Sequence, residues 1–257
     1  MNKYLIIGLI IFLLMFFSIM IIIYVKPDNY KNTIKPKLPI IDNYNYKNKP
    51  TLLSEMEYTQ YNKFPIYTKE GIKVLKLPNH LRSRLTEEWR KNRKNRKIEA
   101  TDKHKGKYVV TNYGKSPTYM VDIDEKLKKE LEKFVLNELN KWTSIPNLKH
   151  TATYGIREYT RNSFLANHVD RYDTHIMSAI INVGQIDIDE PWALTVQSRD
   201  LPTPQDIIFD NGFDVALYES STLMHGRPTS FKGEVYANLF IHYAPSDWKE
   251  QLKELNL

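Results

Sequence analysis

The spacing of hydrophobic residues changes along the chain, and each spacing predicts a different kind of element. Between residues 4 and 25 the chain carries no charge and consists almost wholly of large apolar residues. A helix of about 20 apolar residues is long enough to cross a bilayer. A secretory signal has a shorter apolar core and a small-residue cleavage site, and no such site precedes Lys26. We therefore expect residues 1–25 to form a single transmembrane anchor.

The region that follows has no regular spacing of apolar residues. Residues 26–52 contain Pro27, Pro36, Pro39 and Pro50 among many lysines, asparagines and tyrosines. Prolines at this density oppose a helix and favour an extended chain. We expect these residues to form a tether between the membrane and a globular domain.

Residues 53–145 return to helical spacing, so we expect a helical support region there. Leu81, Leu85 and Trp89 fall on one face of a helix, with charged residues between them. Further along, apolar side chains again recur every three or four positions. The elements expected in this region are a strand at 71–78 and helices at 80–93 and 124–142.

From residue 146 the pattern changes to short β-rich runs separated by Asn, Asp, Gly and Pro. Several such runs at turn spacing predict a β-sandwich or a β-barrel. We therefore expect a mainly β core at residues 146–250, with flanking helices and a transmembrane helix before it. The runs are "TATYGIREYT", "THIMSAIINV", "WALTVQS", "QDIIFD", "DVALYES" and "VYANLFIHYAP".

Charge beside the anchor predicts its orientation. Lysines after the apolar segment outnumber those before it, and the positive-inside bias then places the C-terminal domain in the cytosol. The chain has no cysteine and no Asn-x-Ser/Thr sequon, so neither a disulfide nor a glycosylation signal decides the compartment, and a lumenal domain stays open. The charged residues that follow the anchor are Lys26, Lys31, Lys35 and Lys37, with Asp28 and Asp42 opposing them.

Much of the net charge of +7 lies in residues 82–107, which are rich in Lys and Arg. One interpretation is a solvated helix face followed by a loop. The other is a docking surface for anionic lipid headgroups or an anionic partner. No nucleic-acid-binding motif accompanies the run, so a nucleic-acid partner is not expected.

The stretch "NHVDRYDTH" at residues 167–175 holds the candidate chemistry. His168 and Asp170 are separated by one residue, so on an extended backbone they project to the same side. His225 follows another predicted strand. Two histidines and one carboxylate from neighbouring strands can occupy one face of an octahedral metal site, as in non-haem Fe(II) oxygenases. Asp173 and His175 are expected to be a turn residue and a packed residue.

These residues resemble a known family. The segments "YTRNSFLANHVD", "THIMSAIINV" and "HGRP" with "YANLFIHY" are similar to the 2-oxoglutarate- and Fe(II)-dependent dioxygenases of the prolyl 4-hydroxylase-like branch. The resemblance covers about residues 150 to 246. It implies a double-stranded β-helix, a jelly-roll-like barrel, with His168, Asp170 and His225 as iron ligands. It also implies Fe(II), 2-oxoglutarate and O2 as cofactor and cosubstrates, with ascorbate as a further candidate.

The resemblance further implies a tyrosine and a basic residue that bind 2-oxoglutarate. Tyr159, nine residues before the first histidine, matches the tyrosine. The positions where the family places the basic residue hold Glu234 and Val235, so this chain departs from the pattern. Arg227 is the first candidate, because on a strand it points to the same side as His225 and its planar fork suits a carboxylate. The remaining candidates are Lys232 and Arg157.

Two classes of function follow. The first is a membrane-anchored dioxygenase that hydroxylates a protein or peptide side chain, with a prolyl residue as the leading target. The second is a non-catalytic, membrane-tethered β-barrel that docks an anionic partner through residues 82–107. A zinc hydrolase is weaker, because no further carboxylate stands beside the ligands as a general base. The sequence does not predict the oligomeric state.

Overall fold

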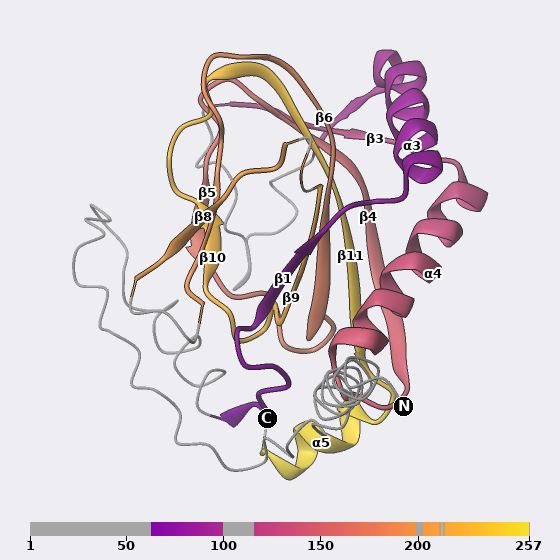
Figure 1. The fold of residues 1–257 in the computed structure, drawn as a ribbon, viewed down its shortest axis with the longest axis vertical. Coiled ribbons are helices and arrows are strands. Elements are labelled where there is room, and N and C mark those ends of the chain that lie inside the picture. The colour runs from indigo at the N-terminus through magenta and orange to yellow at the C-terminus, as the bar shows by residue number, and fades with distance from the viewer. Residues whose placement is uncertain (1–62, 100–115, 199–202, 211, 213, 257) are drawn as a thin grey trace, which may run out of the picture. The chain divides into compact units, whose positions relative to one another are not determined.

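Two antiparallel sheets face each other and enclose an interior (Figure 1). This computed structural model describes residues 63–99, 116–198, 203–210, 212 and 214–256. The seven-stranded sheet has the order β1 (Ile72–Leu75), β9 (Val215–Tyr218), β6 (Met177–Ile188), β11 (Gly233–Pro245), β4 (Leu148–Thr160), β3 (Thr118–Val121) and β2 (Lys97–Ile98). The four-stranded sheet has the order β5 (Leu165–His168), β10 (His225–Arg227), β7 (Leu194–Val196) and β8 (Gln205–Ile207).

Two helices cover the outer face of the large sheet, α3 (Asn79–Asn92) and α4 (Glu125–Trp142) (Figure 1). Leu81, Leu85 and Trp89 are the buried residues of α3, as the sequence predicted. Asp124 begins α4 as an N-cap, since its side chain accepts a hydrogen bond from the Leu127 amide. Both predicted helices are confirmed within one or two residues of their expected ends.

The strands of the large sheet alternate between two hydrophobic clusters. On β11, Leu239 and Ile241 belong to the outer cluster, which they share with the helices. Tyr236 and Phe240 belong to the inner cluster, which lies between the sheets. The inner cluster also contains residues of the small sheet, so the two sheets share one interior. Its buried members are Tyr159, Ile180, Trp192, Leu194, Val196, Phe209, Ala216, Tyr218, Leu223, Phe231, Tyr236 and Phe240.

The support region predicted for residues 53–145 is not purely helical. It contributes β1, β3 and β2 to the large sheet, where β1 pairs with β9 and β3 pairs with β4. Strands from both sides of residue 146 therefore pair within one sheet. The strand predicted at 71–78 is present as β1. The sequence did not predict β2 and β3, because an apolar pattern of two or four residues is too short to identify a strand without its partner.

The two ends of the described chain meet at the turn that follows β5. The ring of Phe64 lies edge-on to the rings of Tyr172 and Trp248, at 5.7 and 5.2 Å. Trp248, the first residue of α5 (Trp248–Glu254), donates its indole hydrogen to the Tyr172 carbonyl at 2.6 Å. These contacts fix the backbone of this turn from outside the barrel.

The predicted anchor at 1–25 and the tether at 26–52 lie outside the described residues. Among the residues that are described, no helix is both long and apolar enough to span a bilayer.

A buried carboxylate fastens α3 to the sheet. Glu158 of β4 is fully buried, and its two oxygens accept hydrogen bonds from three side chains. The donors are Trp89 Nε1 at 2.6 Å, Arg93 Nε at 3.0 Å and Arg96 at 2.9 Å. The network satisfies the charge of Glu158 within the chain, and it ties the end of α3 to the C-terminal part of β4.

Replacing Glu158 with alanine should lower the free energy of unfolding by about 3 kcal/mol, because it leaves two arginines and a buried indole without their shared acceptor. Urea unfolding followed by tryptophan fluorescence measures the change. Glu190→Ala is the control, since Glu190 forms an exposed pair with Lys232 and its loss should leave the midpoint unchanged. Equal midpoints for Glu158→Ala and the wild type would contradict the assignment.

Candidate metal centre

The three residues predicted as metal ligands lie together on two neighbouring strands and one turn. His168 ends β5 and His225 begins β10, and the two are directly opposite each other in the pairing of these strands. Asp170 lies in the turn after β5. One ligand atom from each residue lies within 4.8 Å of the others. The structure thus brings together Asp170 and His225, which are 55 positions apart in the sequence.

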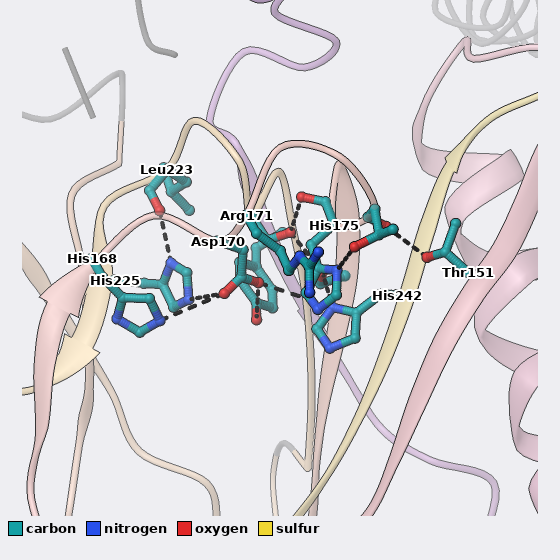
Figure 2. Close-up of polar contacts among 12 residues, drawn as sticks. Thr151, His168, Asp170, Arg171, His175, Leu223, His225 and His242 are labelled. Atoms are coloured by element: carbon teal, nitrogen blue, oxygen red, sulfur yellow. Dashed lines mark hydrogen bonds and ion pairs between the residues drawn. The ribbon is translucent and has the colours of Figure 1, made fainter. Parts of the chain in front are cut away.

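The imidazoles of His168 and His225 both direct Nε2 toward Asp170 (Figure 2). His168 Nδ1 lies 2.8 Å from the Ala166 carbonyl, and His225 Nδ1 lies 2.8 Å from the Leu223 carbonyl. A carbonyl only accepts, so each Nδ1 carries the hydrogen and each Nε2 of the neutral ring keeps a lone pair. The two Nε2 atoms lie 3.5 and 3.8 Å from Asp170 Oδ1.

The electrostatic state of the site suits a cation. Burial lowers the pKa of His225 to about 4, so its ring is neutral and its lone pair is available at neutral pH. Burial works to raise the pKa of the Asp170 carboxyl, but its contacts with His168, His225 and His242 hold that pKa well below the ordinary value. Two imidazoles and one ionised carboxylate form a donor set that fits Fe(II).

The second oxygen of Asp170 faces residues that the sequence did not single out as partners of the site. Asp170 Oδ2 lies 3.5 Å from the Tyr218 hydroxyl and 3.9 Å from His242 Nδ1. Both are inner-face residues, and Tyr218 also packs against the ring of His225 at 4.6 Å. His242 stands two residues after the inner-cluster residue Phe240, and this spacing was the available signal that both side chains face the interior.

Arg227 is fully buried in the shared interior. Its guanidinium lies over the rings of Trp192 and Tyr236, at 4.8 and 4.6 Å, and over Phe209 at 5.6 Å. It donates hydrogen bonds to the Trp192 carbonyl and to the Tyr236 hydroxyl. Both acceptors are neutral, and Arg227 forms no ion pair with any acidic residue among those the structure describes.

The other residues considered for 2-oxoglutarate occupy different surroundings. Tyr159 is buried on the inner face, and its ring lies 5.2 Å from that of Trp192. Arg157 shares this face, but it forms an ion pair with Glu99 and approaches the Tyr159 hydroxyl at 3.5 Å. Lys232 is more than half exposed and pairs with Glu190 at 3.1 Å. Of these three basic residues, Arg227 is therefore the one that is buried and forms no ion pair with a described carboxylate.

The basic run at 82–107 is largely paired within the chain where the structure describes it. Residues 100–107 are outside the described part, so they stay untested. Pairing on this scale leaves little free charge for docking an anionic partner. The ion pairs are Arg82–Asp214, Arg84–Glu130, Lys91–Glu88, Arg93–Glu158, Arg96–Glu158 and Lys97–Asp122.

Replacing His168 or His225 with alanine should weaken metal binding by more than about 100-fold. Removing a ligand lowers metal affinity more than removing a residue that hydrogen-bonds to a ligand. Co(II) titration followed by its visible absorption measures this on the apo protein, where the wild type should bind one equivalent. The control is His150→Ala, since His150 is half-exposed and pairs with Glu132 on the outer side. Wild-type affinity in either triad variant would contradict the assignment.

No protein-family model matches the sequence, and no curated protein matches it in sequence. Solved structures do match the fold. A Trichoplax adhaerens prolyl hydroxylase, in complex with a peptide fragment of hypoxia inducible factor, aligns with a TM-score of 0.51 at 11% identity, over 79% of this chain and 97% of that one.

Two further structures align less closely. A Pseudomonas putida prolyl-4-hydroxylase has a TM-score of 0.49 at 15% identity, over 68% of this chain and 92% of that one. HygX from Streptomyces hygroscopicus, with nickel, 2-oxoglutarate and hygromycin B bound, has a TM-score of 0.47 at 14% identity, over 69% of this chain and 84% of that one. The described chain shares the double-stranded β-helix fold of the Trichoplax prolyl hydroxylase.

Proposed function

We propose that the protein is an Fe(II)- and 2-oxoglutarate-dependent dioxygenase that hydroxylates a protein or peptide side chain. The observation that carries the proposal is the arrangement of His168, Asp170 and His225. Two imidazole lone pairs and one carboxylate oxygen converge on one point. A site that binds its metal through one face leaves the opposite positions open for small molecules.

Arg227 supplies the reason to prefer 2-oxoglutarate as the cosubstrate. A buried guanidinium without a carboxylate partner is costly unless an anion joins it. Arg227 stands two residues after His225 on β10, and both contact inner-cluster residues, Tyr218 and Tyr236 respectively. A dicarboxylate that binds the metal at one end would meet this cation at the other.

Each residue then has a definite task. His168 and His225 hold the metal through Nε2, and the charge of Asp170 partly neutralises it. Arg227 holds the distal carboxylate of the cosubstrate, with the Tyr236 hydroxyl close to it, and Tyr159 belongs to the same inner cluster. The surrounding aromatic side chains exclude water, which strengthens these charged contacts. When bound, iron and 2-oxoglutarate supply the oxidising chemistry, and the chain supplies orientation and a dry site.

The substrate and the location are the finer parts of the proposal. The peptide complex of the Trichoplax prolyl hydroxylase supports a protein or peptide substrate, and a prolyl side chain is the leading target. The apolar run at 4–25 supports a single-pass membrane anchor, and the lysines after it support a cytosolic domain. Residues 26–52 would give this domain reach from the membrane.

The activity is tested with a fragment that begins at residue 50. We expect anaerobic Fe(II) and 2-oxoglutarate to produce a weak visible absorption band, and oxygen with a proline-rich peptide library to produce succinate and a peptide 16 Da heavier by mass spectrometry (one oxygen atom). His225→Ala should give neither signal. A wild-type fragment that binds no iron and forms no succinate with any peptide would rule the enzyme out.

Arg227→Gln should weaken 2-oxoglutarate binding by about 10- to 100-fold, because a charge-assisted contact contributes about 1.5–3 kcal/mol, while Co(II) affinity stays near that of the wild type. Arg227→Lys keeps the charge and should lose less. Lys232→Gln is the control and should bind the cosubstrate normally. The measurement is a titration of the absorption band with 2-oxoglutarate. A loss in Lys232→Gln with none in Arg227→Gln would assign the cosubstrate site to Lys232 instead.

A further inference from the structure

Behind the Asp170 carboxylate lies a chain of short hydrogen bonds between fully or nearly fully buried side chains. His242 Nδ1 lies 2.6 Å from Ser178 Oγ, and Ser178 Oγ lies 2.6 Å from Ser220 Oγ. Ser220 Oγ lies 2.9 Å from the main-chain carbonyl of His175. The His175 ring stacks on the His242 ring at 3.7 Å, which returns the chain to its start (Figure 2).

Counting donors fixes the direction of every bond in this chain. The His175 carbonyl only accepts, so the single hydroxyl hydrogen of Ser220 is donated to it. Ser178 must then donate its own hydrogen to Ser220. Ser178 has no hydrogen left for His242, so His242 must donate from Nδ1. His242 is therefore the tautomer with hydrogen on Nδ1, and its Nε2 carries the lone pair.

Ser220 also fixes both ends of the metal-binding turn. Its main-chain carbonyl accepts the Asp170 amide at 2.7 Å, and its hydroxyl binds the carbonyl of His175. The turn between these residues carries the carboxylate ligand. The Asp170 side chain is then oriented by its surroundings, with Oδ1 toward the two imidazole ligands and Oδ2 toward the Tyr218 hydroxyl.

The N–H group of His242 adds to this orientation. Its hydrogen is donated to Ser178, and its nitrogen lies 3.9 Å from Asp170 Oδ2, so a polar N–H group lies beside the oxygen that does not face the imidazole ligands. A donor near one oxygen of a carboxylate favours ligation through the other. The hydroxyl of Tyr218 acts on the same oxygen, which leaves Oδ1 as the ligand atom.

We propose that Ser220, Ser178 and His242 form a one-way hydrogen-bond chain that positions Asp170 as a monodentate metal ligand. His242 and the two serines are positioning residues, since they act on the metal through Asp170. This role rests on the metal site of the proposed function and is independent of the cosubstrate, the substrate and the membrane anchor.

The direction of the chain is tested in the metal-free wild-type fragment. Long-range proton–nitrogen NMR of the histidine rings distinguishes a hydrogen on Nδ1 from one on Nε2. We expect the Nδ1–H form for His242, assigned by its absence from the spectrum of His242→Asn. Finding His242 with its hydrogen on Nε2 overturns the proposal, whatever the activity of the protein.

The positioning role is tested by Co(II) affinity and by the visible spectrum of bound Co(II). Ser220→Ala should weaken affinity by about 10- to 100-fold, the usual effect of removing a group behind a ligand, and should alter the Co(II) band pattern. Ser163→Ala is the matched control, because Ser163 is an equally buried serine that binds the Thr160 amide in the turn between β4 and β5. It should bind Co(II) as the wild type does.

Two variants at His242 separate positioning from packing. Asparagine places an amide N–H close to the position of Nδ1, whereas glutamine places its amide close to Nε2. His242→Asn should keep Co(II) affinity within about threefold of the wild type, and His242→Gln should lose as much as Ser220→Ala. Equal losses in the two would indicate packing alone and overturn the role.

The outcomes also separate this inference from the proposed function. A wild-type fragment that binds no Co(II) overturns the metal site and the positioning role together. A wild-type fragment that binds Co(II) as tightly as Ser220→Ala does, with identical spectra, overturns the positioning role and leaves the metal site standing. Circular dichroism of each variant shows whether it is folded, and the NMR test on the wild type decides the bond direction without any variant that must bind metal.

Discussion

An ionised carboxylate held between two sheets is the constraint on which the rest of this structure depends. Asp170 is removed from water, so its charge must be met by donors and by a cation. The Tyr218 hydroxyl and the polar N–H of His242 lie beside one of its oxygens. The Nε2 lone pairs of two imidazoles face the other oxygen, which leaves that side for a cation. The two-sheet barrel allows this, because its inner faces bring side chains from several strands to one point while the outer face of the large sheet packs against the helices.

Glu158 and Arg227 are two further buried charges, and they differ in how their charge is met. Glu158 lies on the outer side of the large sheet, and three donors of α3 and its C-terminal extension satisfy it. Arg227 lies on the inner side, surrounded by aromatic rings and neutral acceptors. A charge matched within the chain stabilises the fold. In the proposed function a bound anion meets the charge of Arg227, and the direction in which the strand presents each residue decides between the two.

The sequence was sufficient for the elements with long, regular patterns and for the residues closest to the chemistry. Helical spacing located α3 and α4, and the His-x-Asp spacing with His225 predicted the triad. The strand at 71–78 was predicted, but β2 and β3 escaped because each is short and its partner lies about 20 to 40 residues away. For the same reason the sequence could not connect His242 or Tyr218 with Asp170, since their proximity depends on strand register and on bulges in β11.

Glu219, the residue before Ser220, holds the segment at residues 64–68 that leads into β1. The carboxylate of Glu219 accepts the amides of Tyr67 and Thr68 and the Thr68 hydroxyl, at 3.1, 2.7 and 2.6 Å. Phe64, just before them, covers the turn that carries Asp170 through Tyr172. Residues 64–68 thus pack against the turn that carries Asp170 and against the residue next to Ser220. A shortened protein that begins after residue 68 would keep every strand of the barrel. Its Glu219 carboxylate would lose the donors of Tyr67 and Thr68, beside the turn that carries Asp170.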